Sequence, residues 1–270
     1  MIDGDIRRYY ERGRERERLT HDGGTLELVR TQKLLQRYLP PPPADVLDIG
    51  GGPGVYAAWL AQAGYRVHLV DPLPLHVEQA TEAAAEQLDY PFTAAVGDAR
   101  RLDEPDASCD AALLFGPLYH LTERAERIAA LTEARRVLRP GGLALVVAIS
   151  RFASLLDGLR QGILGDLRVT QVIERTLRDG QHRSPGLDRY PGWFTTSFFH
   201  QPAELAAEVA ESGLSLETLI GIEGPGEFVG KGWADAQQRP HILRAARAVE
   251  HEASLLGVSA HLLAVARKNR

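Results

Sequence analysis

A glycine-rich turn constrains the fold of this chain more than any other sequence feature. The apolar run Val46 to Ile49 comes first, four of the next five residues are glycine, and a helical pattern begins near Tyr56. This order predicts a strand, a tight turn and a helix. Glycine has no Cβ, so the backbone can approach a ligand closely, and the free N–H groups of the following helix favour polar or anionic groups. The turn is therefore predicted to hold a ligand.

The spacing of the glycines separates two kinds of nucleotide-binding turn. A dinucleotide fingerprint starting at Gly50 and Gly52 requires a third glycine at position 55, where this chain has Val55. The run reads instead Asp48-x-Gly50-x-Gly52-x-Gly54. It resembles the first motif of class I S-adenosylmethionine (SAM) dependent methyltransferases of the bacterial small-molecule type.

Apolar runs alternate with helical patterns from residue 44 to residue 149. We expect strands at residues 46–49, 67–70, 92–96, 111–115 and 143–149. Strands that are apolar throughout and separated by helices indicate a parallel sheet covered on both faces. The predicted core is therefore a doubly wound α/β domain. The resemblance implies seven strands in the order 3-2-1-4-5-7-6, with strand 7 antiparallel, and we expect the last two strands at 214–222 and 258–266.

Four segments are expected along the 270 residues. They are an N-terminal helical lid (1–43), a SAM-binding Rossmann-like core (44–150), a cap insertion over the site (151–200) and a C-terminal segment that completes the sheet (201–270). Four prolines separate the lid from the core, and arginine and aromatic residues gather in the cap. An external helical insertion is the alternative for the cap. The alternating charges of residues 5–19 predict a solvated helix face.

Residues just after each strand should form the site, because ligands of a doubly wound sheet lie across the carboxyl ends of the strands. Asp71 follows the second strand, nineteen residues beyond Gly52, at a distance typical of an acid that binds ribose hydroxyls. The resemblance implies that Asp98 bonds the adenine amino group. Each acid has an alternative, Asp71 as a helix cap and Asp98 as an ordinary turn residue. The residues predicted to bind the cofactor are Asp48, Gly50, Gly52, Gly54, Asp71, Pro72, Asp98, Ala99, Phe115 and Gly116. Leu138 to Gly142, which reads Leu-Arg-Pro-Gly-Gly, is also typical of the family.

The resemblance implies in-line transfer of the methyl group of SAM to a small metabolite or natural product, leaving S-adenosylhomocysteine. A hydroxyl or amine acceptor benefits from a base, and histidine has a suitable pKa near neutral pH. His120 lies in the loop after the fourth strand and is the catalytic candidate; packing under the cap is its alternative. We expect an apolar or aromatic acceptor, bound by Tyr9, Tyr10, Tyr119, His120, Trp193, Phe198 and His200. Plain packing is the alternative for the two N-terminal tyrosines, and His76 is expected to be structural.

Composition excludes several other classes of function. The formal net charge of -5 and the absence of a Lys/Arg run give no support to a nucleic-acid partner. Cys109 is the single cysteine, so we expect no disulfide and no metal site. No signal-peptide pattern and no run of about eighteen apolar residues occurs, so we expect a cytoplasmic protein without a membrane partner, as a monomer or homodimer. The alternatives are an NAD(P)-dependent oxidoreductase and a non-catalytic SAM-binding regulatory protein.

Overall fold

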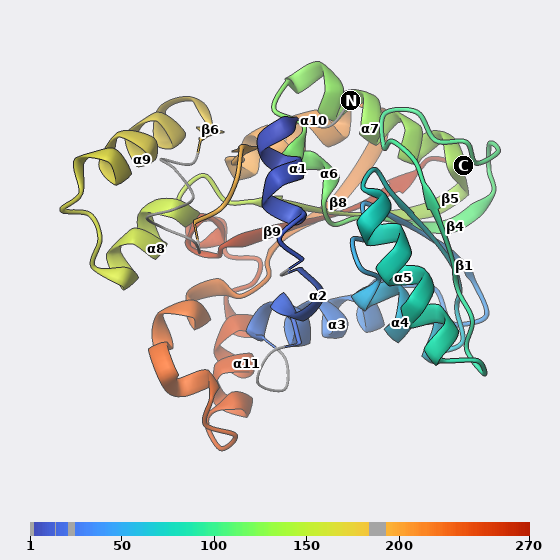
Figure 1. Ribbon diagram of the computed structural model, residues 1–270, viewed down its shortest axis with the longest axis horizontal. Coiled ribbons are helices and arrows are strands. Elements are labelled where there is room, and N and C mark those ends of the chain that lie inside the picture. The colour runs from blue at the N-terminus through green and yellow to red at the C-terminus, as the bar shows by residue number, and fades with distance from the viewer. Residues whose placement is uncertain (1–2, 14, 21–24, 184–192) are drawn as a thin grey trace.

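The computed structural model describes residues 3–13, 15–20, 25–183 and 193–270, except for the side chains of residues 227 and 229–231. Within these ranges the chain forms a seven-stranded sheet with helices on both faces (Figure 1). Residues 184–192, which belong to the predicted cap insertion, lie outside the described residues.

The sheet has the predicted strand order. From one edge to the other it runs β3-β2-β1-β4-β5-β9-β8. Its strands are β1 (Asp45–Ile49), β2 (Arg66–Asp71), β3 (Thr93–Val96), β4 (Cys109–Leu114), β5 (Leu138–Ile149), β8 (Leu214–Gly221) and β9 (His261–Lys268). β1 to β5 pair in parallel, while β9 is antiparallel to both β5 and β8. The predicted antiparallel strand at this edge is therefore confirmed.

β5 begins five residues earlier than the sequence predicted, at Leu138 rather than at Leu143. The Pro-Gly-Gly residues belong to the first part of β5, where Gly141 has a φ angle of 79°. The pairing register between the two strands shifts between Cys109 and Ala111, and this irregularity accommodates the extra residues.

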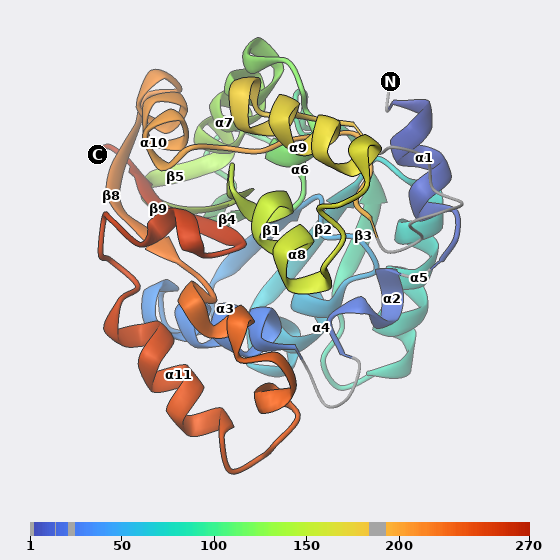
Figure 2. The same ribbon diagram turned by 90° about the vertical axis from the view of Figure 1, so that its left-hand side faces the viewer.

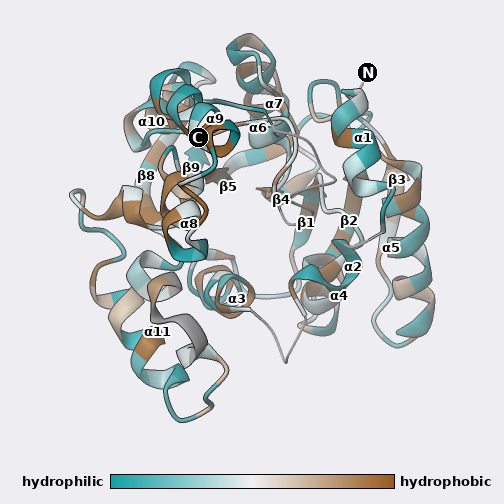
Figure 3. Ribbon diagram, turned by 60° about the vertical axis from the view of Figure 1, so that its left-hand side comes forward, coloured by the Kyte–Doolittle hydropathy of each residue, from teal (hydrophilic) through white to brown (hydrophobic). Residues whose placement is uncertain are grey.

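Side chains of each central strand alternate between two apolar layers, as the pleat of a strand requires. Leu47 and Ile49 pack in the layer covered by α7 (Arg124–Val137) and α10 (Pro202–Glu211). Val46 packs in the opposite layer, which α3 (Leu26–Tyr38), α4 (Val55–Gln62) and α5 (Pro74–Glu86) cover. Figure 3 shows hydrophobic residues along the central strands and hydrophilic ones concentrated on peripheral helices such as α5 and α10.

Segments outside the sheet cover the carboxyl ends of its parallel strands. The segment predicted as a lid (1–43) contains α1 (Gly4–Tyr10), α2 (Glu15–Arg18) and α3, and α1 buries Ile6 and Tyr10 against Leu73. The segment predicted as a cap (151–200) contains α8 (Ala153–Gln161), α9 (Leu167–Asp179) and the small sheet of β6 (Gln181–His182) and β7 (Ser197–Phe198). In Figure 2, α8 and α9 lie in front of the strands and α1 lies to one side of them.

Four further elements lie within the described residues. They are the one-turn helix α6 (Pro117–His120), the 3-10 helix η2 (Gly224–Trp233), the helix α11 (Arg239–Ala248) on which η2 packs, and the 3-10 turn η3 (Leu256–Val258). In the part of the chain that the structure describes, we find no helix with the length and apolar character needed to cross a membrane.

Candidate active site

The glycine-rich turn follows β1 and requires glycine for two reasons. Its φ angles are positive at three alternate glycines, Gly50, Gly52 and Gly54 (72°, 57° and 88°). This region of backbone conformation is open to glycine at little cost and is unfavourable for residues with a Cβ. At Gly51, a Cβ would lie 2.6 Å from both the Oδ2 atom of Asp48 and the Cδ1 atom of Leu69. The turn therefore depends on backbone without side chains, as the sequence predicted.

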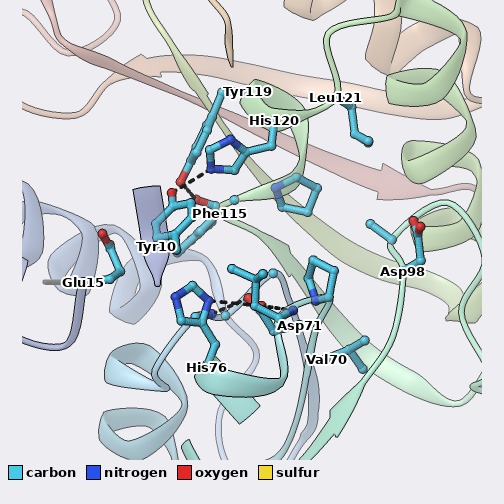
Figure 4. A pocket seen from close by; sticks show the side chains of 18 of the residues that line it. Tyr10, Glu15, Val70, Asp71, His76, Asp98, Phe115, Tyr119, His120 and Leu121 are labelled. Atoms are coloured by element: carbon cyan, nitrogen blue, oxygen red, sulfur yellow. Dashed lines mark hydrogen bonds and ion pairs between the residues drawn. The ribbon is translucent and has the colours of Figure 1, made fainter. Parts of the chain in front are cut away.

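Asp71, at the end of β2, holds the glycine turn and the start of α5 together. Its Oδ2 atom accepts a hydrogen bond from the Gly52 N–H (3.0 Å), and its Oδ1 atom accepts one from the Leu73 N–H (2.9 Å). Nδ1 of His76 lies 3.1 Å from the same Oδ1 atom. The predicted helix-capping alternative for Asp71 is not realised, because Leu73 is the N-cap residue of α5 and Asp71 bonds the N–H of Leu73 rather than one in the first helical turn. The same carboxylate also faces the cavity described next (Figure 4).

A cavity of about 350 Å³ lies over the carboxyl ends of the central strands. Most of the residues predicted to bind the cofactor line it: Gly50, Gly52, Asp71, Pro72, Asp98, Ala99, Phe115 and Gly116. These residues follow four different strands. The cavity therefore lies across the carboxyl ends of the strands, where the ligand was expected. Asp98 was expected to bond the adenine amino group. In the structure, Arg100 donates hydrogen bonds to both of its carboxylate oxygens. These hydrogen bonds hold the pKa of Asp98 below its usual range.

Asp48 and Gly54 were predicted at the cofactor, but the structure places both outside the cavity wall. Asp48 is fully buried beneath the turn, and none of the described residues hydrogen bonds to either of its oxygens. Burial, together with the nearby charge of Asp71, raises the pKa of Asp48 to about 7. Gly54 faces Phe92, whose ring would lie 3.2 Å from a Cβ at this position. Asp48 and Gly54 therefore contribute to the packing of the turn and do not face the cavity.

Tyr10, Tyr119 and His120 meet at the cavity from two distant parts of the chain. The Tyr10 hydroxyl lies 2.7 Å from Nε2 of His120, and Tyr119 donates a hydrogen bond of 2.6 Å to the Phe115 carbonyl (Figure 4). Burial lowers the pKa of His120 to about 4, against opposing effects of the Asp71 carboxylate and the nearby Thr196 backbone. His120 is therefore a neutral imidazole near neutral pH.

Four other residues predicted to bind the acceptor do not line the cavity. Tyr9 packs its ring against Tyr10 and Phe194, with centroids 5.1 and 5.6 Å apart, and so follows the predicted packing alternative. Trp193 donates from Nε1 to Nε2 of His182 at 2.8 Å, inside the cap.

Phe198 and His200 belong to a buried network that joins the cap to α7 and α10. The Arg127 guanidinium lies 3.6 Å from the ring centroid of Phe198 and donates to the Glu208 carboxylate. His200 is fully buried, with Nε2 3.1 Å from Oε2 of Glu208. These two residues were predicted to touch the acceptor because they belong to the aromatic group of the segment expected to enclose it, but they contact Arg127 and Glu208 instead.

Charged residues of the N-terminal segment also line the cavity, which the sequence did not predict. Glu15 and Arg18 line it, although the alternating charges of this segment predicted a solvated helix face. Arg18 donates to Glu15 and to Glu27, each at 2.7 Å. Burial alone would raise the pKa of Glu27, but the charge of Arg18 outweighs it and lowers that pKa to about 2. His76, expected to be structural, also faces the cavity, and its Nε2 atom is buried without a hydrogen-bond partner among the described residues.

Comparison with known proteins agrees with the geometry. Residues 46–142 match the family described as a methyltransferase domain. The ubiquinone biosynthesis O-methyltransferase of Xylella fastidiosa (strain M23) is 30% identical over 182 residues, which cover 66% of this chain and 64% of the relative. The ubiquinone/menaquinone biosynthesis C-methyltransferase UbiE of Ruegeria sp. (strain TM1040) is 34% identical over 139 residues, covering 50% of this chain and 53% of the relative. The matched region thus spans less than two thirds of either relative.

The fold is shared with solved structures at lower identity. A crystal structure of a SAM-dependent methyltransferase from Methanosarcina mazei superimposes with a TM-score of 0.60 at 18% identity, covering 87% of this chain and 97% of that one. Strand order, glycine turn and the match over residues 46–142 agree with one another. Residues 46–142 therefore form a methyltransferase domain, and the sheet of the described residues has the class I, Rossmann-like fold.

Proposed function

We propose that this protein transfers the methyl group of SAM to a hydroxyl group of a small molecule. One observation carries the proposal: the glycine turn, the Asp71 carboxylate and the Tyr10–His120 pair line one cavity at the switch point of the sheet. When bound, SAM supplies an electrophilic methyl group on a cationic sulfur. The protein must then bind both partners, exclude water and accept a proton.

The cofactor side of the cavity suits the three parts of SAM. Asp71 is the acceptor for ribose hydroxyls, since its carboxylate faces the cavity while backbone N–H groups fix its orientation. Asp98 and Ala99 lie where the adenine is expected from the resemblance. The zwitterionic methionyl tail needs charges of both signs. Arg18 and Glu15 supply them, and Arg18 uses only three of its five N–H donors on Glu15 and Glu27.

Three side chains with hydrogen-bonding groups, those of Tyr10, His120 and Thr196, line the cavity together with Tyr119, whereas Trp193 and Phe198 lie outside it. Such a wall favours an acceptor with hydrogen-bonding groups over a purely apolar one. A hydroxyl is the first acceptor to test, because a paired tyrosine and histidine suit removal of its proton and because the relative from Xylella fastidiosa is named as an O-methyltransferase.

Two measurements test the proposal. Calorimetry should show binding of SAM and S-adenosylhomocysteine, with NAD as the control ligand that does not bind. Methyl-labelled SAM should then pass its label to phenols, catechols or aliphatic alcohols in a panel, or to a component of a metabolite extract. Failure of SAM to bind at millimolar concentration would refute the cofactor assignment, and binding of SAM without any labelled product would refute the activity.

A further inference from the structure

The pair formed by Tyr10 and His120 joins the N-terminal lid to the loop after β4. The Tyr10 hydroxyl lies 2.7 Å from Nε2 of His120, between residues 110 positions apart in sequence. The two rings meet edge to face at 5.3 Å, and on its other side Tyr10 meets His76 at 5.0 Å. Figure 4 shows Tyr10 between these two histidines. The hydroxyl is therefore held in a defined position beside the cavity.

Neither nitrogen of His120 is available to an acceptor while the lid has this position. Nε2 is occupied by the Tyr10 hydroxyl. Nδ1 is buried and has no hydrogen bond of ordinary geometry within the described residues. Tyr10 and His120 both line the cavity. Because Nε2 is occupied and Nδ1 is buried, a proton from the cavity reaches Nε2 through the Tyr10 oxygen.

We propose that Tyr10 is a catalytic residue, whose hydroxyl receives the proton of the acceptor and passes its own proton to Nε2 of His120. This inference rests on the proposed function. In the reaction the acceptor O–H bond breaks and its oxygen forms a bond to the methyl carbon. The carbon–sulfur bond breaks and its electron pair stays on sulfur. Tyr10 exchanges one proton for another, His120 becomes an imidazolium, and no group is oxidised or reduced.

This proton path keeps the charge of the cavity constant. One positive charge is on the sulfonium before transfer and on the imidazolium after it, so the net charge of the cavity stays the same. The sulfonium disfavours a protonated His120 until the methyl group leaves, and this repulsion then disappears. The charged and ring groups beside the pair differ in their effect. The Asp71 carboxylate favours the imidazolium of His120, and the His76 ring opposes it. On the other side of the pair, burial together with Tyr119 and Glu15 raises the pKa of the Tyr10 hydroxyl.

The position of Tyr10 on the lid couples proton release to product release. Moving α1 away breaks the bond between Tyr10 and His120 and opens the imidazole to water, which can take the proton. The path is complete only when the lid is closed, so acceptor activation requires closure.

A test without any acceptor examines the direction of the Tyr10–His120 hydrogen bond. NMR of isotope-labelled imidazole, with S-adenosylhomocysteine bound at neutral pH, reports which nitrogen of His120 carries the proton. We expect a proton on Nδ1 and an Nε2 atom that accepts from Tyr10, with a signal that moves in Tyr10→Phe. A proton on Nε2 would overturn the proposal, because that atom could not accept another.

A second test uses single-turnover transfer of labelled methyl to the extract or panel described above. Tyr10→Phe keeps the ring contacts and removes the hydroxyl, and it should slow transfer by about 10²–10⁴-fold, as loss of acid–base catalysis does. Affinity for S-adenosylhomocysteine should stay within about threefold of the original. Adding His120→Ala to Tyr10→Phe should slow transfer little further, since the two residues act as one unit. Raising the pH should restore the rate of Tyr10→Phe as the acceptor ionises by itself.

Tyr9→Phe is the matched control, since it removes a hydroxyl from the same helix outside the cavity. Equal rates for Tyr10→Phe and Tyr9→Phe would leave Tyr10 a lid contact only and would overturn the proposal. Failure of the proposed function gives a different result, because the unmodified protein then transfers no label at all.

Discussion

Gly51 lies directly over the carboxylate of Asp48, so closely that a methyl group at Gly51 would be 2.6 Å from Oδ2. Asp48 is fully buried and cannot move aside into solvent. Gly51→Ala should therefore displace the turn and destabilise the protein by about 1–3 kcal/mol, the usual cost of overpacking. Gly165→Ala is the control, since no heavy atom lies within 4 Å of a Cβ there. Denaturant unfolding of both variants checks the prediction, and equal stabilities would contradict it.

Asp71 should contribute to cofactor affinity as well as to the start of α5. Asp71→Ala removes the acceptor proposed for ribose hydroxyls and should weaken S-adenosylhomocysteine binding by about 1.5–3 kcal/mol, the range for hydrogen bonds to a charged group. Calorimetry measures this, with Asp89→Ala, at an exposed position, as control. If the stability falls and the affinity does not, Asp71 only supports the glycine turn and the residue before α5.

Two substitutions of His76 can separate its hydrogen bond to Asp71 from the packing of its ring on Tyr10. It contacts Asp71 through Nδ1 at 3.1 Å and meets the Tyr10 ring at 5.0 Å. His76→Asn retains a donor at the position of Nδ1, and His76→Phe retains the ring. If His76 orients Asp71 for the cofactor, His76→Phe should lose about 0.5–1.5 kcal/mol of S-adenosylhomocysteine affinity, and His76→Asn should keep most of it. The opposite order in calorimetry would assign His76 to lid packing instead.

The ion pair between Glu27 and Arg18 predicts acid sensitivity. Folding lowers the pKa of Glu27 from 4.5 to about 2, so its contribution is complete above pH 4.5 and is lost as the pH falls to about 2. Because the Arg18 side chain is 38% exposed, we expect only about 1–2 kcal/mol from this pair. Glu27→Gln should remove that part of the pH dependence of unfolding. Glu17→Gln, at an exposed position of α2, should leave the pH profile unchanged.

Strand order and glycine turn could be predicted because local patterns determine them. The central strands are mainly apolar, and the turn contains glycines whose φ angles no other residue adopts easily. Asp71 was predicted because it is the last residue of its strand. Asp48 looked equivalent, but it lies one residue before the end of β1, and the strand pleat turns its side chain beneath the glycine turn.

The cavity wall away from the strands could not be predicted, because tertiary packing decides it. Glu15 and Arg18 have the spacing of an exposed ion pair, and only the docking of α2 brings them to the cavity. Phe198 and His200 are residue types that are common in ligand sites. Within this protein, however, Phe198 contacts Arg127 and His200 contacts Glu208. Which partner an aromatic or charged side chain meets depends on contacts far away in sequence.

Because α1 is short, its folding is coupled to the binding of ligands in the cavity next to it. An isolated helix of seven residues is unstable in water, so α1 depends on the docking of Ile6 and Tyr10 for its order. The free energy of ordering this helix then becomes one component of every affinity measured at the cavity. Gly4→Ala, whose Cβ would make an ordinary contact of 3.5 Å with Arg8, should favour the helix by about 0.4–1 kcal/mol. Ligand affinity in this protein can thus be tuned from a position that no ligand touches.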